Sequence, residues 1–129
     1  MSSLATFPPL LLVALGGAFG ACARYLVGRW SLVAFGPDLP LGTLIVNVSG
    51  GLAMGLLAGW LARPGSGAEH LRLLVGVGVL GGFTTFSAFS LEVVTMLERG
   101  EALWALGYAL ASVTGAVLAV FAGLWLARA

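Results

Sequence analysis

The stretch Gly81–Ser90, which reads GGFTTFSAFS, decides how this chain folds. It lies within an uncharged run from Leu73 to Leu91, about the length that crosses a bilayer. Paired glycines weaken a helix centre, each by about 1 kcal/mol relative to alanine. Irregular backbone at membrane depth survives only where protein or water surrounds it. We therefore expect a membrane-spanning helix broken at its centre, as in the discontinuous helices of transport proteins.

The glycines of this stretch also allow a plainer interpretation. They could form a close helix–helix contact, with the neighbouring hydroxyl groups bonded back to their own helix. The whole cluster of glycines, threonines, phenylalanines and serines favours a functional role, because a simple anchor needs neither a flexible point nor hydroxyl groups at its centre.

The composition indicates an all-α integral membrane protein. Of 129 residues, 60% are hydrophobic and 9% are charged, which is more apolar surface than most soluble domains could bury. Four segments are apolar and long enough to span a bilayer, and they leave no room for a soluble domain. These spans of a single membrane domain are about 9–27, 41–62, 73–96 and 102–127. The net charge of +1 argues against a nucleic-acid partner.

Small residues recur every four positions, which places them on one helix face where backbones can approach closely. The second span carries Gly51, Gly55 and Gly59, and the first carries Gly16 and Gly20. The fourth span has a similar track from Gly107 through Ala111, Gly115 and Ala119 to Gly123. Four short spans offer few internal surfaces for so many such faces, so we expect a homo-oligomer.

The arginines are balanced between the two sides of the membrane. The side with both termini carries Arg63, Arg72 and Arg128, and the other side carries Arg24, Arg29 and Arg99. The chain has no lysine, so the positive-inside rule gives no preferred orientation. One interpretation is a weak bias that the insertion machinery resolves. The other is dual topology, in which two copies insert in opposite orientations and pair antiparallel.

Polar residues inside the spans indicate the chemistry, because intramembrane polar groups usually face a bundle interior or a cavity. They are Thr43 and Asn47 on the second span, Thr84, Thr85, Ser87 and Ser90 on the third, and Tyr108 and Ser112 on the fourth. Almost all of them can donate hydrogen bonds. Phe86 and Phe89 share a face of the third span and could turn positive ring edges toward a pore. Such a lining suits a small anion that accepts hydrogen bonds.

Two charged residues lie close to these spans. Arg24 could extend to the membrane interface, as arginines near helix ends often do, or it could raise the anion concentration in a vestibule. Glu92 lies nearer the end of its span and could pair with such an arginine.

Three motifs together resemble the Fluc (CrcB) family of fluoride channels over nearly the whole chain. They are Gly16-Gly17 through Gly20 to Arg24-Tyr25, Gly42-Thr43 with Val46-Asn47 and Gly50, and Gly81-Gly82-Phe83-Thr84-Thr85-Phe86-Ser87. The resemblance implies a dual-topology antiparallel homodimer in the plasma membrane, with two pores that export fluoride passively from the cytoplasm.

The resemblance also implies roles for individual residues. A structural sodium ion would be held by main-chain carbonyls of Gly81 and Thr84 from both copies. The fluoride path would be lined by Asn47, Phe86 and Phe89, with Thr43, Ser87, Tyr108 and Ser112 along a polar track. Arg24 and Glu92 would belong to a vestibule. Ala116 and Ala88 depart from the family pattern, Ala116 standing where a further hydroxyl is expected.

Two other functions are open on the residues alone. A small four-helix proton-coupled solute transporter would need a mid-membrane carboxylate on the first span, and 11–23 offers none. A non-transporting membrane assembly subunit would explain the glycine faces but not the hydroxyl-rich third span. An enzyme is least favoured, because no nucleophile–base pair or metal-ligand cluster is visible.

Overall fold

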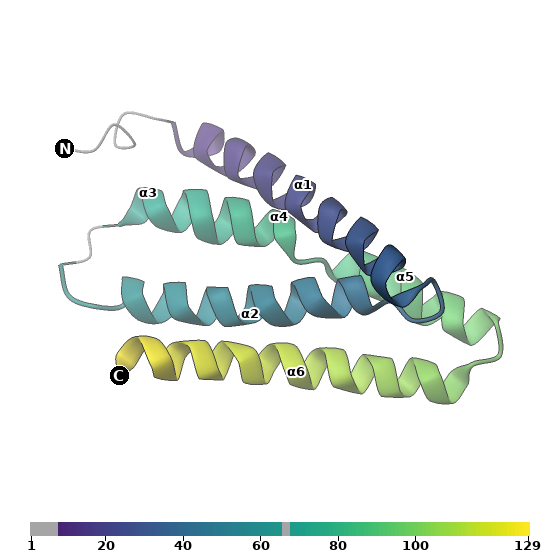
Figure 1. Cartoon of the computed structure of the whole chain (residues 1–129). Helices are drawn as coiled ribbons and strands as arrows, with labels where there is room; N and C mark the ends of the chain where they lie inside the picture. The colour runs from purple at the N-terminus through teal and green to yellow at the C-terminus, as the bar shows by residue number, and fades with distance from the viewer. Residues whose placement is uncertain (1–7, 66–67) are drawn as a thin grey trace.

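The computed structural model describes residues 8–65 and 68–129, and these residues form helices and no strands (Figure 1). The elements are α1 (Pro9–Phe35), α2 (Leu41–Leu61), α3 (Glu69–Leu71), the π-helical η2 (Arg72–Leu80), α4 (Gly81–Phe83), α5 (Phe86–Glu98) and α6 (Ala102–Arg128). Four helical stretches are long and apolar enough to cross a membrane, the third being the composite Glu69–Glu98. The prediction of an all-α protein with four spans is confirmed for these residues.

The first helix is longer than the sequence predicts. We expected the first span to end near Val27, but α1 continues to Phe35. The earlier glycines of α1 keep a negative φ, whereas Gly36 has φ +80° and donates its N–H to the Leu32 carbonyl at 3.0 Å. A glycine adopts this left-handed conformation at little cost, so α1 ends here.

Helices α2 and α6 lie side by side along their length (Figure 1). A Cβ atom at Gly51 would come within 2.9 Å of the Ala116 carbonyl oxygen. At Gly55 it would approach the Cα of Gly123 to 3.0 Å, and at Gly59 it would approach Ala127 Cβ to 2.6 Å. The glycine face of the second span is therefore used inside one chain and does not argue for an oligomer.

The first span uses its glycines in the same way. In Figure 1 α1 crosses obliquely over the third span, which lies between α1 and α2. A Cβ at Gly16 would come within 2.9 Å of Gly78 Cα, and one at Gly82 would come within 2.5 Å of the Gly17 carbonyl oxygen. On α6 the predicted track is only partly used, because nothing lies within 4 Å of such an atom at Gly107.

The third span is broken, but at the threonines and not at the glycine pair. Gly81 is helical, with φ −62° and ψ −39°. Thr84 and Thr85 are extended, with ψ 156° and ψ 123°. The Thr85 hydroxyl then accepts a hydrogen bond from the Ala88 N–H at 3.1 Å and caps α5. The paired glycines thus serve close packing against α1, and the threonines interrupt the helix.

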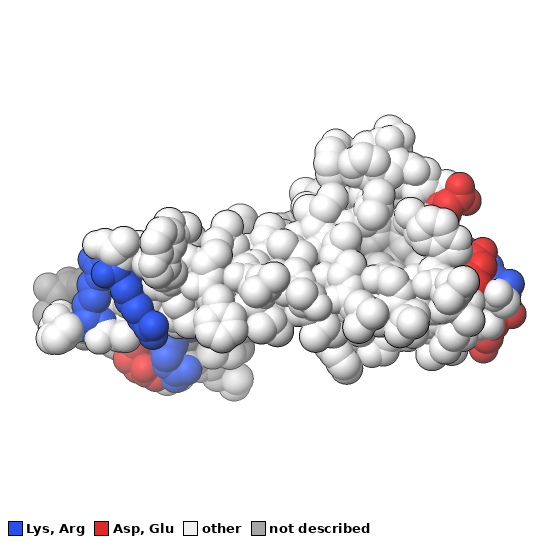
Figure 2. Space-filling model, turned by 90° about the horizontal axis from the view of Figure 1, so that it is seen from below, with Lys and Arg blue, Asp and Glu red and all other residues white. Residues whose placement is uncertain are grey.

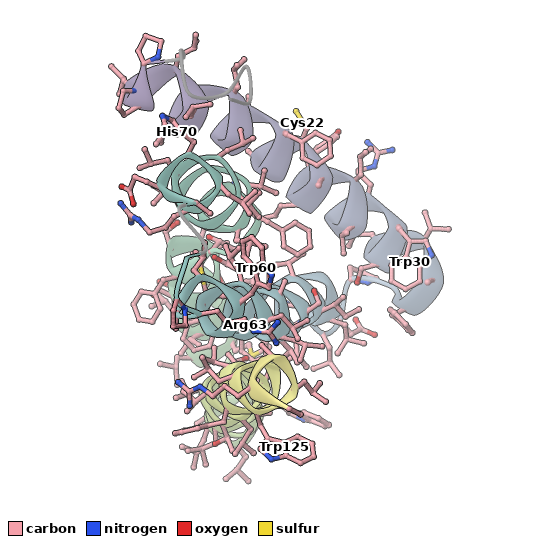
Figure 3. The ribbon with its side chains drawn as sticks, turned by 90° about the vertical axis from the view of Figure 1, so that its left-hand side faces the viewer. Cys22, Trp30, Trp60, Arg63, His70 and Trp125 are labelled. Carbon is pink, nitrogen blue, oxygen red and sulfur yellow. The ribbon has the colours of Figure 1, made fainter. Side chains whose placement is uncertain are left out.

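Charged side chains gather at the two ends of the molecule and leave an uncharged middle (Figure 2). At the end that holds the C-terminus, the Arg63 guanidinium donates to the main-chain carbonyl of Ala127. Figure 3 shows Trp125 pointing outward from the same end, and Trp30 lies near the far end of α1. This placement is typical of aromatic residues at a membrane interface. Of the loop between the second and third spans, residues 66–67 lie outside the described part.

Candidate functional site

The break in the third span is held by a side chain of α2. The Asn47 amide donates from Nδ2 to the Thr85 carbonyl at 2.9 Å, and its Oδ1 accepts the Thr85 N–H at 2.8 Å. Asn47 thereby satisfies both main-chain groups of an extended residue at membrane depth, where water would otherwise be required. Asn47 retains one further amide hydrogen for a ligand.

Glu92 joins three helices. Its carboxylate accepts a hydrogen bond from the Thr43 hydroxyl on α2 at 2.6 Å and another from the Tyr108 hydroxyl on α6 at 2.6 Å. Both donors were expected along a polar track, and in this structure both donate to Glu92. Among the described residues Glu92 forms no ion pair with Arg24, so the possible pairing of the two is not seen. The site is a partly buried junction in which one carboxylate links α2, α5 and α6.

Arg24 reaches the break itself. Its Nε donates to the Gly82 carbonyl at 3.1 Å, across the contact between α1 and α4. In a continuous helix that carbonyl would accept from Phe86, which instead begins α5. Arg24 therefore ties the first span to the interruption in the third, a contact that neither of its expected roles includes.

Arg24 and Glu92 nevertheless line a common cavity of about 360 Å³, which we name the outer cavity. Its other lining residues come from α1, the start of α2 and α5, and they include Arg29, Ser31, Gly42, Thr43 and Thr85. With two arginines and one carboxylate, this cavity has the composition expected of a vestibule for anions.

A second cavity of about 390 Å³, which we name the inner cavity, is lined at the break by Thr84, Thr85 and Phe86. It brings together four of the predicted pore residues, Asn47, Phe86, Phe89 and Ser112, and Thr85 lines both cavities. Ala116, which stands where the family pattern has a hydroxyl, also lines this cavity. The clamped residue Thr85 thus stands between the two spaces.

The two phenylalanines of the inner cavity differ in environment. Phe86 is 77% exposed, whereas Phe89 is buried at 9% and packs between two rings. The Phe89 ring centroid lies 5.6 Å from that of Phe86 and 5.4 Å from that of Tyr108, both in tilted arrangements. Phe89 is therefore core as well as cavity wall, and Phe86 faces outward from this single copy.

Ser112 carries the clearest sign of a missing ligand. Its hydroxyl is buried and makes no hydrogen bond within 3.5 Å to the described residues, although it lies near enough to Tyr108 to interact with that hydroxyl. A buried polar group without a partner costs about 1–3 kcal/mol, so a ligand or water is expected beside it. The remaining predicted residue, Ser87, is exposed at the break, where its hydroxyl lies 3.4 Å from that of Thr85.

The predicted cation ligands also lie at the break. In a helix the carbonyls of Gly81 and Thr84 would accept from Thr85 and Ala88. Those two N–H groups are diverted, the first to Asn47 Oδ1 and the second to Thr85 Oγ1. Both carbonyls therefore lose their usual donors, which is the condition that favours a cation bound by main-chain oxygens.

The sequence did not reveal the partners of Asn47, Thr43 and Glu92. The partners are 38 and 49 residues apart and lie on different helices. The spacing of residues along the chain does not predict such a contact, because it forms only when the spans pack together.

The comparisons with known proteins agree on one family. A family model described as "CrcB-like protein, Camphor Resistance (CrcB)" matches residues 11–124. A relative from Caulobacter sp. (strain K31) is 60% identical over 120 residues, which cover 92% of this chain and 94% of that protein. One from Mesorhizobium japonicum is 55% identical over 92% of this chain and 95% of its own length. Both relatives carry the name "Fluoride-specific ion channel FluC".

Proposed function

The chain belongs to the CrcB family, and we propose that it exports fluoride from the cytoplasm by passive flux along a path through its inner cavity. It is a fluoride channel and a multi-pass protein of the plasma membrane. Its relatives are named as ion channels, which are not enzymes. Family membership sets aside the solute transporter and the assembly subunit.

The observation that carries the path is the unpartnered Ser112 hydroxyl. It is buried in the wall of a cavity that also contains Asn47, Phe86 and Phe89. A hydroxyl and the free amide hydrogen of Asn47 are donors, and phenylalanine edges carry partial positive charge. Fluoride is small and accepts hydrogen bonds strongly, so this lining would replace part of its hydration shell.

The Thr43–Glu92–Tyr108 junction lies beside this path and has a different role. The two hydroxyls donate short hydrogen bonds to the Glu92 carboxylate, and these bonds hold α2, α5 and α6 together. The junction therefore supports the polar track as a positioning element, and Ser112 and Asn47 supply the donors to the anion.

An antiparallel homodimer is supported by the outward-facing break. Gly81, Phe86 and Ser87 are exposed in the single chain, at the centre of a membrane-spanning element. Polar or irregular backbone at this depth requires protein or water around it, so a second copy is the natural cover. The balance of three arginines on each side is compatible with both orientations, which would generate two pores related by a two-fold axis.

A structural sodium ion fits the carbonyls at the break. Gly81 and Thr84 would hold it through main-chain oxygens from both copies, because the N–H groups that would serve these oxygens are bonded elsewhere. A monovalent, oxygen-preferring cation would neutralise the carbonyl dipoles in a low-dielectric interior. Complete replacement of sodium by a bulky organic cation should weaken the dimer and fluoride flux together. Unchanged flux, with no cation at the two-fold axis, would remove this ion from the proposal.

The path is tested with purified protein in liposomes loaded with fluoride. We expect efflux of fluoride and little efflux of chloride, measured with ion-selective electrodes. Ser112→Ala should lower fluoride flux, since it removes the unpartnered donor without creating a large void. The control is Ser49→Ala, whose hydroxyl is exposed and bonds the carbonyl of Ile45 on its own helix at 2.6 Å. Equal flux in both variants would show that the path does not pass Ser112.

A further inference from the structure

The end of α1 passes the first turn of α2 at one wall of the outer cavity. Ser31 lies at this crossing and is only 4% exposed. A Cβ atom built on Gly42 would lie 3.3 Å from Ser31 Oγ and 3.2 Å from Gly28 Cα, so the hydroxyl rests against the start of α2. Among residues 8–65 and 68–129 this hydroxyl makes no hydrogen bond, and it is not one of the enclosed polar atoms without a partner, so it stays accessible from the outer cavity. Ser31 also lines the outer cavity.

The first turn of α2 offers donors at the same place. Its cap residue is Pro40, which provides no side-chain hydrogen bond. Leu44 is the first residue of α2 whose N–H bonds to the preceding turn in the helical pattern, to the Pro40 carbonyl at 3.3 Å. The N–H groups of Gly42 and Thr43 are therefore left without helical acceptors, as at any helix start. Such a helix end favours negative charge.

The charges around the outer cavity agree with an anion. Arg24 and Arg29 line it, and Arg29 holds Tyr25 by a hydrogen bond of 3.3 Å. The one carboxylate in the wall, Glu92, is occupied by two hydroxyl donors. Its negative charge would oppose an anion near it, which places the favourable region toward Ser31 and the arginines.

We propose that the Ser31 hydroxyl and the main-chain N–H groups of Gly42 and Thr43 form an outer binding site for a small monovalent anion. In the conducting protein the anion is fluoride, and the site collects it in the outer cavity before it passes Thr85. This role in conduction rests on the proposed function, whereas binding of the anion does not.

The plainer account of Ser31 is a small residue chosen to let α1 and α2 approach. That account requires only its size, so alanine would serve equally well. The anion site requires the hydroxyl, so Ser31→Ala separates the two accounts with a change of one atom. Ser49→Ala is the matched control, because Ser49 lies outside the outer cavity and its hydroxyl is bonded to Ile45.

The first measurement is bromide binding in crystals of the full-length protein, located by anomalous scattering. We expect a bromide peak between Ser31 Oγ and the start of α2 in the wild type and in Ser49→Ala, and none in Ser31→Ala. A wild type without this peak, or a peak that persists in Ser31→Ala, overturns the proposal. This readout needs no fluoride flux, so it remains decisive even if the proposed function fails.

The second measurement is the fluoride concentration that gives half-maximal flux in liposomes. Loss of one hydrogen bond to the anion should raise it about threefold to tenfold in Ser31→Ala. The maximal flux should stay near the wild-type value, because the inner cavity is untouched. An unchanged half-maximal concentration would overturn the role of this site in conduction.

Discussion

Asn47 and Thr85 exchange two hydrogen bonds across the contact between α2 and the break of the third span, at 2.9 and 2.8 Å. The side-chain amide supplies the two hydrogen bonds that a neighbouring strand would supply to an extended residue. It fixes Thr85 between the outer and inner cavities and keeps one amide hydrogen available. One residue therefore holds the break and faces the proposed ion path.

Replacement of Asn47 by aspartate should abolish fluoride flux. The new oxygen would face the Thr85 carbonyl where Nδ2 now donates, which turns an attraction into a repulsion. A charge at this depth would also repel fluoride. Flux in liposomes and the dimer fraction in size-exclusion chromatography would be measured together. Loss of flux with an intact dimer is expected, and normal flux would contradict the assignment of the path.

The two phenylalanines should respond differently to isoleucine. Phe86→Ile and Phe89→Ile each remove a ring edge from the inner cavity, so each should cut fluoride flux sharply. Phe89→Ile should lower the stability of the single chain by about 1–2 kcal/mol, because Phe89 is buried. Phe86 is 77% exposed in the single chain, so Phe86→Ile should change stability only through contacts with the second copy. Thermal unfolding in detergent separates the effects. Normal flux in both variants would show that the rings are only packing residues.

Glu92→Gln should destabilise the bundle. The amide can accept from one hydroxyl, but its NH₂ group would then meet the other as a second donor. Losing a short, charge-assisted hydrogen bond between helices costs about 1.5–3 kcal/mol. The thermal midpoint in detergent should fall, while Glu98→Gln, at an exposed position near the end of α5, should leave it unchanged. A thermal midpoint of Glu92→Gln equal to that of the wild type would show that the junction does not stabilise the bundle.

Substitution by alanine should have different effects at Gly81 and at Gly82. Gly82→Ala would push a methyl group to 2.5 Å from the Gly17 carbonyl oxygen, so it should destabilise each chain. A methyl at Gly81 would meet only the Gly76 carbonyl oxygen at 3.7 Å, an ordinary contact. If Gly81→Ala still dissociates the dimer or stops flux, the obstruction comes from the second copy or the ion between the copies. A dimer of full activity would argue that Gly81 faces neither.

Added lysines should fix one orientation. Ala62→Lys with Pro64→Lys places two charges on the side that holds both termini, which now has three arginines against three. Expressed alone, this variant should insert one way and lose activity. Co-expression with Ala34→Lys, Pro37→Lys, which biases the other side, should restore flux. Single-sided labelling that finds one orientation for the unmodified chain would refute dual topology.

The sequence by itself determined the class of protein and the family. Four apolar stretches and the interrupted third span follow from composition and local preferences, which act within one helix at a time. The motifs around Asn47 and Gly81–Ser87 indicated a fluoride channel before any contact was known. These features are readable because each depends on residues that are neighbours along the chain.

Only the tertiary structure decided how those residues are used. The spacing of Gly51, Gly55 and Gly59 indicated close packing, but not that α6 of the same chain would fill that face. The hydroxyls of Thr43 and Tyr108 were expected along a polar track, and packing directs both to Glu92. The physical reason is that a donor in a low-dielectric interior bonds the nearest acceptor, and the folding of distant helices determines which acceptor that is.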